Sequence, residues 1–324
     1  MNILIIKTSS MGDLVHTYPA ITECKRHFPE ANFTWLCEEN FAEVAQLHPA
    51  ISVVKTLSIR RWRKNWLSAP VTAEISALKA DLKAGAWDKV IDCQGLLKSA
   101  IPTLWAGQHK SGVTHGYDFA SAKEGWASFF YQHKWPVDKQ LNAVSRNKKL
   151  FSLALGYEAD LTQVDFGLDL SQFTRPELVD DSPYAVFLHA SSASRKLWPL
   201  SHWVTLGLAL DQPILLPWGN EAEKEAAQKI AAEIPKARVL PFLSVSHLAN
   251  LLANANAVVG VDTGLTHLAN ALHVPLVAIF TDTNPEKTGI YAHEFAANIG
   301  QIKNVPSAAS VFNLLLEKRK NFLY

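Results

Sequence analysis

The sequence predicts an α/β protein with two halves, each built on a parallel sheet. Three observations support this prediction. Short apolar runs alternate with helical patterns, the 324 residues suffice for two domains, and a polar, acidic stretch at residues 157–183 interrupts the alternation. Strands that alternate with helices form βαβ units, and the strands of such units run parallel.

Seven apolar runs have the length of buried strands, and they cover residues 2–7, 32–37, 87–92, 184–189, 213–217, 257–261 and 274–280. Helical patterns cover residues 14–28, 72–84, 96–106, 139–155, 200–210, 221–234, 245–253, 264–272 and 307–320. We expect a first domain over residues 1–160, a linker over 161–183 and a second domain over 184–306. The active site is expected in the cleft between the domains, at the carboxyl ends of the strands.

The composition excludes several classes of protein. With 48% apolar and 19% charged residues, the chain is not collagen-like, coiled-coil or disordered. No apolar run is long enough to span a bilayer, and the opening NILIIK lacks the basic region of a signal peptide, so we expect a cytoplasmic protein. Cys24, Cys37 and Cys93 have no metal-ligand spacing and are expected to be reduced and mostly buried.

The net charge of +1 conceals an asymmetry between the two halves. Residues 1–150 hold 19 Lys and Arg against 13 Asp and Glu, whereas residues 151–324 hold 12 against 17. An acidic substrate or a membrane surface therefore suits the first half. Nucleic acid is not expected as a partner, because no long basic run with interleaved aromatic residues extends along the chain.

The turn after the first strand reads KTSSMGD over residues 7–13. Its small residues let backbone amides approach a ligand, and a helix follows. Asp13 suits two roles, a cap on that helix or a general base that takes a proton from a hydroxyl nucleophile. The residues alone leave both roles open. The turn is neither a dinucleotide fingerprint nor a Walker loop.

Two turns in the second half suit a phosphorylated ligand. The segment HASSASRKLWP at 189–199 offers hydroxyls and cations, and Lys196 is placed to neutralise a departing pyrophosphate; a solvated loop over Trp198 fits equally well. In GVDTGLTH, residues 260–267, a strand leads into a helix whose first amides suit a phosphate. Asp262 would repel that phosphate, so it is expected to bond a sugar hydroxyl or to orient the loop. His267, in the first turn of the helix, faces either the core or the cleft, and next to this turn it is expected to contact the ligand.

Cations gather at two further places in the first half. The run Arg60-Arg61-Trp62-Arg63-Lys64 is either a solvated face or a grip on carboxylates or phosphates, and Lys98 follows the third predicted strand. No cluster of His, Cys, Asp or Glu has metal-ligand spacing, so neither a metal nor a cofactor is expected.

These blocks together resemble the bacterial ADP-heptose:lipopolysaccharide heptosyltransferases of glycosyltransferase family 9. The resemblance spans roughly residues 1–320 and rests on the order of ILIIKTSSMGDLVHTYPA, RRWRK, DCQGLLKSA, FLHASSASRKLWP, LPWGNEAEKEAA and VDTGLTHLANAL. The RRWRK run and the KTSSMGD opening favour the members that add the first heptose to the Kdo region of lipid A.

The resemblance implies a GT-B fold of two Rossmann-like domains and a metal-independent transfer that inverts the donor anomer. The first domain would bind the acceptor, Kdo₂-lipid A, and the second would bind the donor, ADP-heptose. The helix within residues 307–324 would pack back on the first domain. The enzyme would act in inner-core lipopolysaccharide biosynthesis, as a peripheral protein on the cytoplasmic face of the inner membrane.

The resemblance also implies roles for individual residues. Asp13 would be the base that activates the acceptor hydroxyl, and Lys196 would assist the leaving group. The donor positions are Ser191, Ser192, Lys196, Glu223, Leu243, Asp262, Thr263, Gly264 and His267. The acceptor positions are Ser9, Ser10, Gly12, Arg60, Arg61, Arg63, Lys64 and Lys98. This chain has Ser191-Ser192 where threonines are expected and Leu243 where methionine is common, and both changes keep the chemical character.

Two other functions also fit the sequence. One is a GT-B transferase for another nucleotide sugar or a later core acceptor, and the other is a non-catalytic sugar-nucleotide-binding protein, which would not need Asp13. The missing glycine fingerprint disfavours a nicotinamide dehydrogenase, and the missing Gly-x-Ser-x-Gly disfavours an α/β hydrolase.

Overall fold

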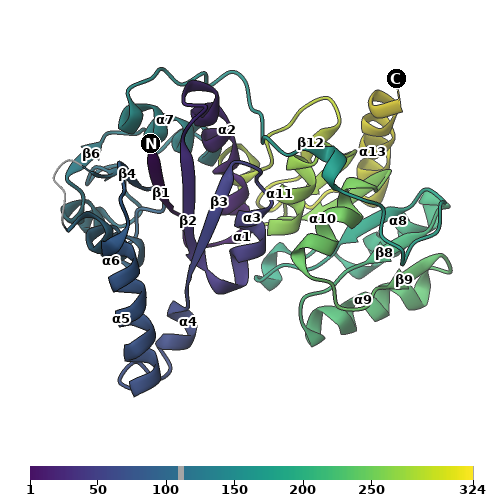
Figure 1. The fold of residues 1–324 in the computed structure, drawn as a ribbon. Coiled ribbons are helices and arrows are strands. Elements are labelled where there is room, and N and C mark those ends of the chain that lie inside the picture. The colour runs from purple at the N-terminus through teal and green to yellow at the C-terminus, as the bar shows by residue number, and fades with distance from the viewer. Residues whose placement is uncertain (109–112, 324) are drawn as a thin grey trace. The chain divides into compact units, whose positions relative to one another are not determined.

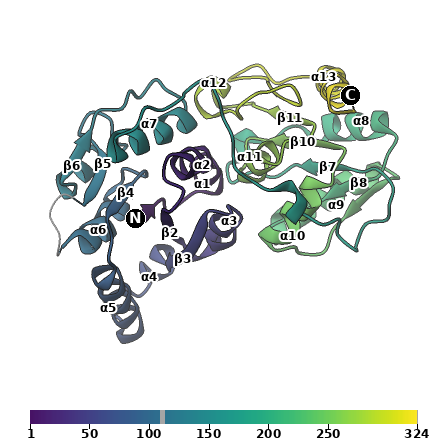
Figure 2. The ribbon, with the colours of Figure 1, turned by 45° about the horizontal axis from the view of Figure 1, so that its top comes forward.

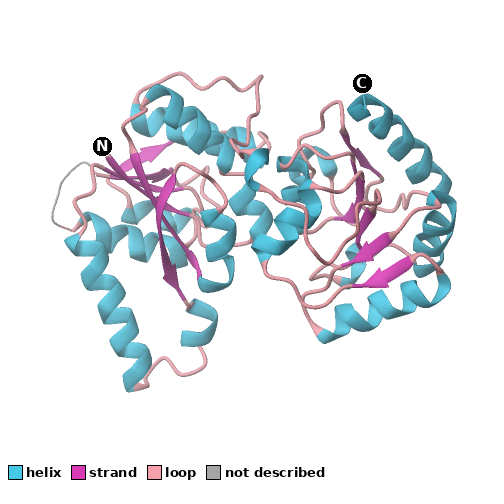
Figure 3. Ribbon diagram, turned by 45° about the vertical axis from the view of Figure 1, so that its right-hand side comes forward, coloured by secondary structure: helices cyan, strands magenta, loops and turns pink. Residues whose placement is uncertain are grey.

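The computed structural model describes residues 1–108 and 113–323. The chain divides into two units, Met1–Gly167 and Leu168–Tyr324, and this division falls within the range 161–183. Figure 1 shows the course of the chain in each unit, and Figure 3 distinguishes helices, strands and loops. Each unit consists of a parallel sheet with helices on both of its faces.

The first unit contains, among its described residues, a six-stranded sheet in the order β3-β2-β1-β4-β5-β6. All neighbouring strands pair in parallel. The strands are β1 (Asn2–Ile6), β2 (Asn32–Glu38), β3 (Ile51–Leu57), β4 (Lys89–Asp92), β5 (Thr114–Tyr117) and β6 (His133–Trp135). The α-helices are α1 (Met11–Val15), α2 (Tyr18–His27), α3 (Ala42–Gln46), α4 (Ile59–Trp62), α5 (Ala69–Ala84), α6 (Leu97–Gly107) and α7 (Ala143–Leu155), and 3-10 turns form η1 (Glu39–Phe41) and η2 (Gly125–Phe130).

Both faces of the first sheet are covered, which explains its uninterrupted apolar strands. On one face, Leu4 and Ile6 of β1 belong to the same buried cluster as Leu78 and Leu82 of α5. α2 and α7 pack against each other, and Tyr18 of α2 meets Trp35 of β2 edge to face with ring centroids 6.1 Å apart.

The second unit repeats this topology, with a six-stranded parallel sheet in the order β12-β11-β10-β7-β8-β9 within the described residues. The strands are β7 (Ala185–Leu188), β8 (Ile214–Leu216), β9 (Ala237–Val239), β10 (Ala257–Val261), β11 (Leu276–Ile279) and β12 (Ala296–Ile299). The α-helices are α8 (Leu200–Leu210), α9 (Glu221–Glu233), α10 (Val245–Ala253), α11 (Gly264–Ala271), α12 (Pro285–Thr288) and α13 (Ala308–Leu323), and 3-10 turns form η3 (Leu170–Gln172) and η4 (Ser194–Lys196).

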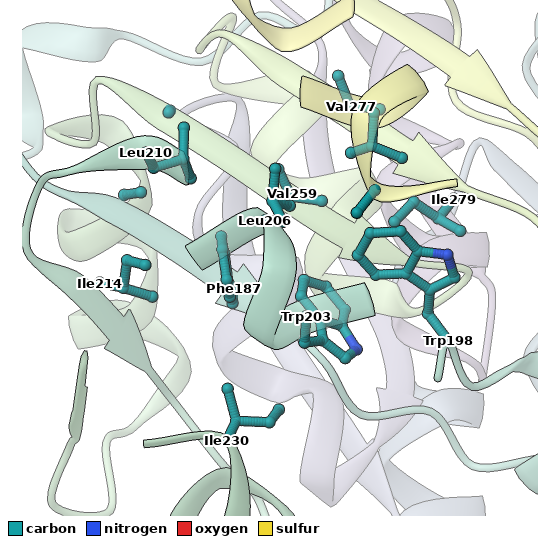
Figure 4. Close-up of a cluster of buried hydrophobic side chains, with 14 of the residues drawn as sticks. Phe187, Trp198, Trp203, Leu206, Leu210, Ile214, Ile230, Val259, Val277 and Ile279 are labelled. Atoms are coloured by element: carbon teal, nitrogen blue, oxygen red, sulfur yellow. The ribbon is translucent and has the colours of Figure 1, made fainter. Parts of the chain in front are cut away.

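Figure 2 labels the helices α8, α9 and α13, and one buried cluster under them forms a core of the second unit (Figure 4). Phe187, Val259 and Val277 reach it from three adjacent strands, since alternate residues of a strand share a face. Trp198 and Trp203 meet there edge to face, with centroids 5.0 Å apart. α13 contributes Ala308, Val311 and Leu315, while its expected contact with the first unit stays a prediction.

The seven predicted strands correspond to β1, β2, β4, β7, β8, β10 and β11, so these predictions are confirmed. Sequence analysis missed β3, β5, β6, β9 and β12. β6 and β9 are three residues long, β5 reads THGY and β12 reads AANI. β3 is an edge strand in which only the two end residues are buried, so none of these strands is a continuous buried apolar run.

The helix predicted at residues 14–28 was wrong in its bounds. The structure forms α1 from Met11 and a separate α2 from Tyr18, because Pro19 occupies the first turn of α2, where a proline starts a helix more readily than it continues one. Asp13 consequently lies inside the first turn of α1.

Candidate active site

Both sheets reverse their strand order between two adjacent strands, β1 and β4 in the first unit and β7 and β10 in the second. The loops that leave two such strands diverge to opposite faces of the sheet, so a crevice opens at the carboxyl ends. Asp13 and Lys98 follow β1 and β4, and the turns that hold Lys196 and Asp262 follow β7 and β10. The run 60–64 follows β3 instead, and Glu223 and Leu243 follow β8 and β9. The topology therefore places the first group where ligands bind in α/β proteins.

The turn after β1 fixes the carboxylate of Asp13. Its Oδ2 accepts hydrogen bonds from the backbone amide of Ser10 at 3.0 Å and from the Ser10 hydroxyl at 3.3 Å. This contact caps the start of α1, so the capping role is confirmed. The same contact holds the carboxylate in one place, which a general base also requires.

Gln94, in the loop after β4, holds the backbone that leads into this turn. Its Oε1 accepts hydrogen bonds from the amides of Thr8 at 3.0 Å and Ser9 at 3.2 Å. The amide of Gln94 in turn donates to Oδ1 of the buried Asp92 at 2.8 Å. Sequence analysis gave Gln94 no role of its own. Its place directly after a buried strand was the available signal.

Positive charges dominate the surroundings of Asp13. Burial acts to raise the pKa of Asp13, but the charges of Lys7 and Lys123 and the Ser10 amide outweigh burial and lower this pKa to about 2. Lys7 is buried, and its Nζ donates to the carbonyl of Cys93 at 2.8 Å. Lys123 belongs to the segment after β5 and was missed in the sequence. The carboxylate is therefore ionised at neutral pH and only weakly basic.

Lys98 lies beside the same turn. Its Nζ donates a hydrogen bond to the Ser9 hydroxyl at 2.6 Å. Burial lowers the pKa of Lys98, and the nearby charges of Arg60 and Arg63 lower it further against the opposing charges of Glu38 and Asp13. Arg60, Arg63 and Lys98 thus share one end of the first sheet with Asp13.

Arg61 faces a different environment from Arg60 and Arg63. Its guanidinium lies 2.9 Å from a carboxylate oxygen of Glu74 and 3.4 Å from one of Glu39. These contacts connect α4 with α5 and η1, beside a cavity of about 420 Å³ that Arg61 and Trp62 help to line. Lys64 is exposed just after α4, and Gly12 is buried within α1.

Asp262 is the centre of the polar cluster in the second unit. Its Oδ2 accepts hydrogen bonds from Lys196 Nζ and from the Thr283 hydroxyl, each at 2.7 Å. Nε2 of His267 lies 3.9 Å from its Oδ1. Burial acts to raise the pKa of Asp262, but its bonds with His267, Lys196 and Thr283 outweigh burial and hold this pKa well below its ordinary range. Asp262 was expected to bond a sugar hydroxyl or to orient the loop. Its contacts with Lys196 and Thr283 fit the second role, because they connect three loops.

Two further contacts connect the loops after β7, β10 and β11. The Ser191 hydroxyl donates to the carbonyl of Asp262 at 3.0 Å, and the Thr281 hydroxyl donates to the carbonyl of Arg195 at 2.9 Å. Sequence analysis missed Thr281 and Thr283, although both follow the predicted strand 274–280 at once. Ser192 is exposed beside this network.

The turn between β10 and α11 requires glycine at position 260. A Cβ there would lie 2.2 Å from the Thr266 hydroxyl, which itself donates to the Val261 carbonyl at 2.7 Å. The amide of Thr266 donates to the Thr263 carbonyl at 3.1 Å. The Thr266 amide is therefore occupied, and an anion would meet the earlier amides of the turn, at the half-exposed Thr263, Gly264 and Leu265.

Glu223 stabilises the turn after β8. Glu223 lies in the first turn of α9, and its Oε2 accepts a hydrogen bond from the backbone amide of Gly219 at 2.8 Å. Trp218, in the same turn, meets Phe242 edge to face with ring centroids 5.7 Å apart, and Leu243 follows Phe242. Sequence analysis did not single out Trp218. The structure shows that it contacts the exposed ring of Phe242.

Among residues 1–108 and 113–323, no group of three or more His, Cys, Asp or Glu side chains is placed to hold a metal ion. Within the part of the chain that the structure describes, no helix is both long and apolar enough to cross a membrane.

Two Rossmann-like units, each with polar loops at its topological switch point, make up the architecture of GT-B glycosyltransferases. This chain belongs to glycosyltransferase family 9, the heptosyltransferase family, whose sequence model matches residues 75–312.

Individual relatives agree with this assignment. The chain is 43% identical over 294 residues to lipopolysaccharide heptosyltransferase 1 of Escherichia coli K12, which covers 90% of this chain and 91% of the relative. It is also similar to a structure of the E. coli heptosyltransferase WaaC with ADP, at a TM-score of 0.90 and 41% identity over 98% of this chain and 100% of that one. A structure of WaaC with ADP-2-deoxy-2-fluoro heptose matches at a TM-score of 0.87 and 39% identity, over 98% of this chain and 99% of that one.

Proposed function

We propose that this chain transfers heptose from ADP-heptose to a Kdo residue of Kdo₂-lipid A in lipopolysaccharide inner-core synthesis. The transfer inverts the anomeric carbon and needs no metal ion. Heptosyl transfer agrees with the family and with the relatives named lipopolysaccharide heptosyltransferase 1. One observation favours an enzyme over a binding protein, namely a fixed, ionised carboxylate at Asp13 in the unit to which the acceptor is assigned.

The donor is assigned to the second unit. The similar structures that hold ADP and a fluorinated ADP-heptose support ADP-heptose as the donor. The first amides of α11 would bind the diphosphate, and Lys196 would neutralise the charge that develops on ADP as it leaves. Asp262 keeps the Lys196 ammonium in place at 2.7 Å, so the cation is positioned before the donor arrives. Ser191, Ser192, Glu223, Leu243 and His267 would complete the donor site.

Asp13 would act on the acceptor. The acceptor oxygen attacks the anomeric carbon from the face opposite ADP, the bond from that carbon to the diphosphate oxygen breaks, and the bond's electron pair leaves with ADP. Asp13 takes the proton of the acceptor hydroxyl. Because the pKa of Asp13 is about 2, this proton moves late, after the attacking oxygen has become acidic through bond formation.

The acceptor is assigned to the first unit by charge. Kdo carries a carboxylate and lipid A carries phosphates, whereas Arg60, Arg63 and Lys98 gather near Asp13. Ser9, Ser10, Gly12, Arg61 and Lys64 complete the proposed acceptor set, in which Arg61 would act by holding α4. The same excess of positive charge would attract the anionic inner leaflet of the inner membrane, and this attraction would weaken as salt rises.

The decisive experiment measures ADP release from ADP-heptose with and without de-acylated Kdo₂-lipid A, in EDTA. Release that depends on the acceptor supports the proposal. Release that requires added divalent cation overturns metal independence. Binding of ADP-heptose without release, even with the acceptor present, would replace the proposal with a different acceptor or a binding protein.

Asp13→Ala tests the proposed base in the same assay, with Asp138→Asn as a control at an exposed carboxylate. Asp13→Ala should abolish turnover and leave ADP binding nearly intact, because the donor lies on the other unit. Retained turnover in Asp13→Ala would remove Asp13 from the role of base.

A further inference from the structure

Three aromatic side chains form an exposed cluster on the first unit. Phe119, Trp126 and Phe129 are 55%, 67% and 64% exposed. Their rings nevertheless touch one another, with centroid separations of 5.9 Å, 6.2 Å and 5.6 Å. Isolated apolar residues on a surface are ordinary, but a cluster of large rings that contact each other in solvent indicates a surface that becomes covered.

α6 adds an apolar stripe next to this cluster. Leu97, Ile101 and Leu104 are 40%, 42% and 41% exposed, and their spacing puts them on one side of the helix. The buried side of α6 packs on η2, where Ala100 and Ala127 share one buried cluster. Trp126 and Phe129 of η2 and the α6 stripe therefore belong to two elements that pack against each other, and Phe119 contacts both of these rings. Together, these six residues are called the apolar patch.

The apolar patch adjoins the candidate acceptor site. The amide of Leu97, the first residue of α6, donates to a carboxylate oxygen of Glu124 at 2.7 Å. The preceding residue, Lys123, is exposed and contributes to the low pKa of Asp13 through its charge. The segment that carries the aromatic rings therefore also carries a cation that acts on the proposed base.

The chemistry of the apolar patch matches an anionic lipid bilayer. Lys134 lies over the ring of Phe129, 5.5 Å from its centroid, so a cation and an aromatic ring occupy the same spot. Aromatic and aliphatic side chains beside lysines are the composition of surfaces that enter the headgroup region, where rings reach the acyl boundary and ammonium groups stay with phosphates.

We propose that the apolar patch contacts the bilayer, so that the lipid acceptor is met while its acyl chains remain in the membrane. The proposal rests on the proposed function in that the acceptor is a lipid. The basic residues contribute an electrostatic attraction to the membrane, which salt screens. The apolar patch would contribute a second attraction, which salt does not screen.

The test compares Trp126→Ser/Phe129→Ser with the unchanged full-length protein. The control is Leu208→Ser, which removes a side chain that is 57% exposed on α8 of the second unit. Partition into vesicles of phosphatidylcholine with a quarter phosphatidylglycerol is measured by co-sedimentation at low and high salt. We expect the double variant to partition about tenfold less at both salt concentrations, because it loses apolar contact area, and the control to partition normally.

Two measurements of turnover decide whether the lower vesicle partition reflects a lost contact with lipid. Turnover of the de-acylated, water-soluble acceptor should be equal in the double variant and the unchanged protein, while turnover of the acceptor embedded in vesicles should fall. Equal vesicle partition of the two proteins would overturn the proposal. So would self-association of the unchanged protein, detected by sedimentation velocity, that the double variant abolishes without a change in vesicle partition. Failure of both proteins on the soluble acceptor would count against the proposed function, and partition alone would then decide the role of the apolar patch.

Discussion

At the scale of single residues, the cap formed by Asp13 and its proposed role as a base are compatible. Its carboxylate caps α1 through the Ser10 amide, and the same contact would hold it for the proposed proton transfer. The cap and the lysines keep this carboxylate ionised, which makes it available as a base and limits its strength. Asp262, in the loop after β10 of the second unit, has a different task, since its carboxylate holds the ammonium group of Lys196.

The acid side of the pH profile should report the environment of Asp13. The folded pKa is about 2, below the ordinary value of about 3.9, so the ionised form favours the folded state. Both the stabilisation and the basic form are present above about pH 4 and are lost as pH falls through the folded pKa. We therefore expect kcat/KM to stay constant as the pH is lowered from about 7 to about 5.

Lys7→Met should move this acid limb upward, because the largest charge that lowers the pKa of Asp13 is removed while burial still raises it. Lys139→Met is the control, since Lys139 is exposed in the loop before α7. The measurement is kcat/KM against pH with the soluble acceptor, with thermal melting to check folding. An acid limb above about pH 5 in the unchanged protein would contradict this account of Asp13.

Lys196→Met should reduce kcat by about 10²- to 10³-fold, the usual cost of removing one donor that stabilises charge in the transition state. The affinity for ADP, measured by calorimetry, should fall less. Arg195→Met is the matched control, because Arg195 lies in the same turn but pairs with Asp282 and is 71% exposed. Equal losses in both variants would indicate that the turn as a whole is perturbed and that Lys196 has no specific role.

At the scale of elements, both candidate sites are formed by loops that contact one another through hydrogen bonds and an ion pair. The loop after β4 holds the loop after β1 through Gln94, and the loops after β7 and β11 hold the loop after β10 through Lys196 and Thr283. The turn that carries Asp13 and the side chain of Asp262 are thus held by residues from loops after other strands. Strand order sets these neighbours, and they are distant in sequence.

Gly260→Ala should lower the free energy of unfolding by about 1–3 kcal/mol, the usual cost of overpacking, because the new Cβ would approach the Thr266 hydroxyl to 2.2 Å. Adding Thr266→Ala removes the clashing hydroxyl and should restore part of this loss, although the bond to the Val261 carbonyl is lost as well. Thermal or urea unfolding of the single and double variants measures the effect. A double variant no more stable than Gly260→Ala would show that the clash with Thr266 is not the cause.

At the scale of the whole molecule, the chain contains two units with the same strand order and separate cores. The division matches the asymmetry of charge, since the excess of positive charge lies in residues 1–150. This asymmetry supports the proposal that an anionic lipid acceptor and a nucleotide donor bind to different units.

The second unit expressed alone, as residues 168–324, should fold and bind ADP, because its core is completed within its own sequence by α8, α9 and α13. Circular dichroism should show a cooperative melt, and calorimetry should give an ADP affinity within about tenfold of that of the full chain. A fragment that does not fold, or that folds without binding ADP, would show that donor binding depends on the first unit.

Much of the architecture could be predicted from the local pattern of apolar and polar residues. Long apolar strands such as β1 and β10 are buried on both faces, so the sequence marks them clearly, whereas β6 and β9 are too short to be marked. Motif order identified the family, and the polar residues after β1, β4, β7 and β10 identified the ends of the sheets that carry the candidate site.

The sequence by itself determined the α/β class, the two halves, the family and the segments that carry the candidate site. Only the tertiary structure decided that Asp13 is surrounded by Lys7 and Lys123, that Arg61 pairs with Glu39 and Glu74, and that Gln94 and Thr283 brace the site. The physical reason is that helix and strand patterns depend on neighbours within a few residues. Charges and hydrogen bonds depend instead on distance in space, and strand order brings together residues such as Thr8 and Gln94, which are 86 positions apart.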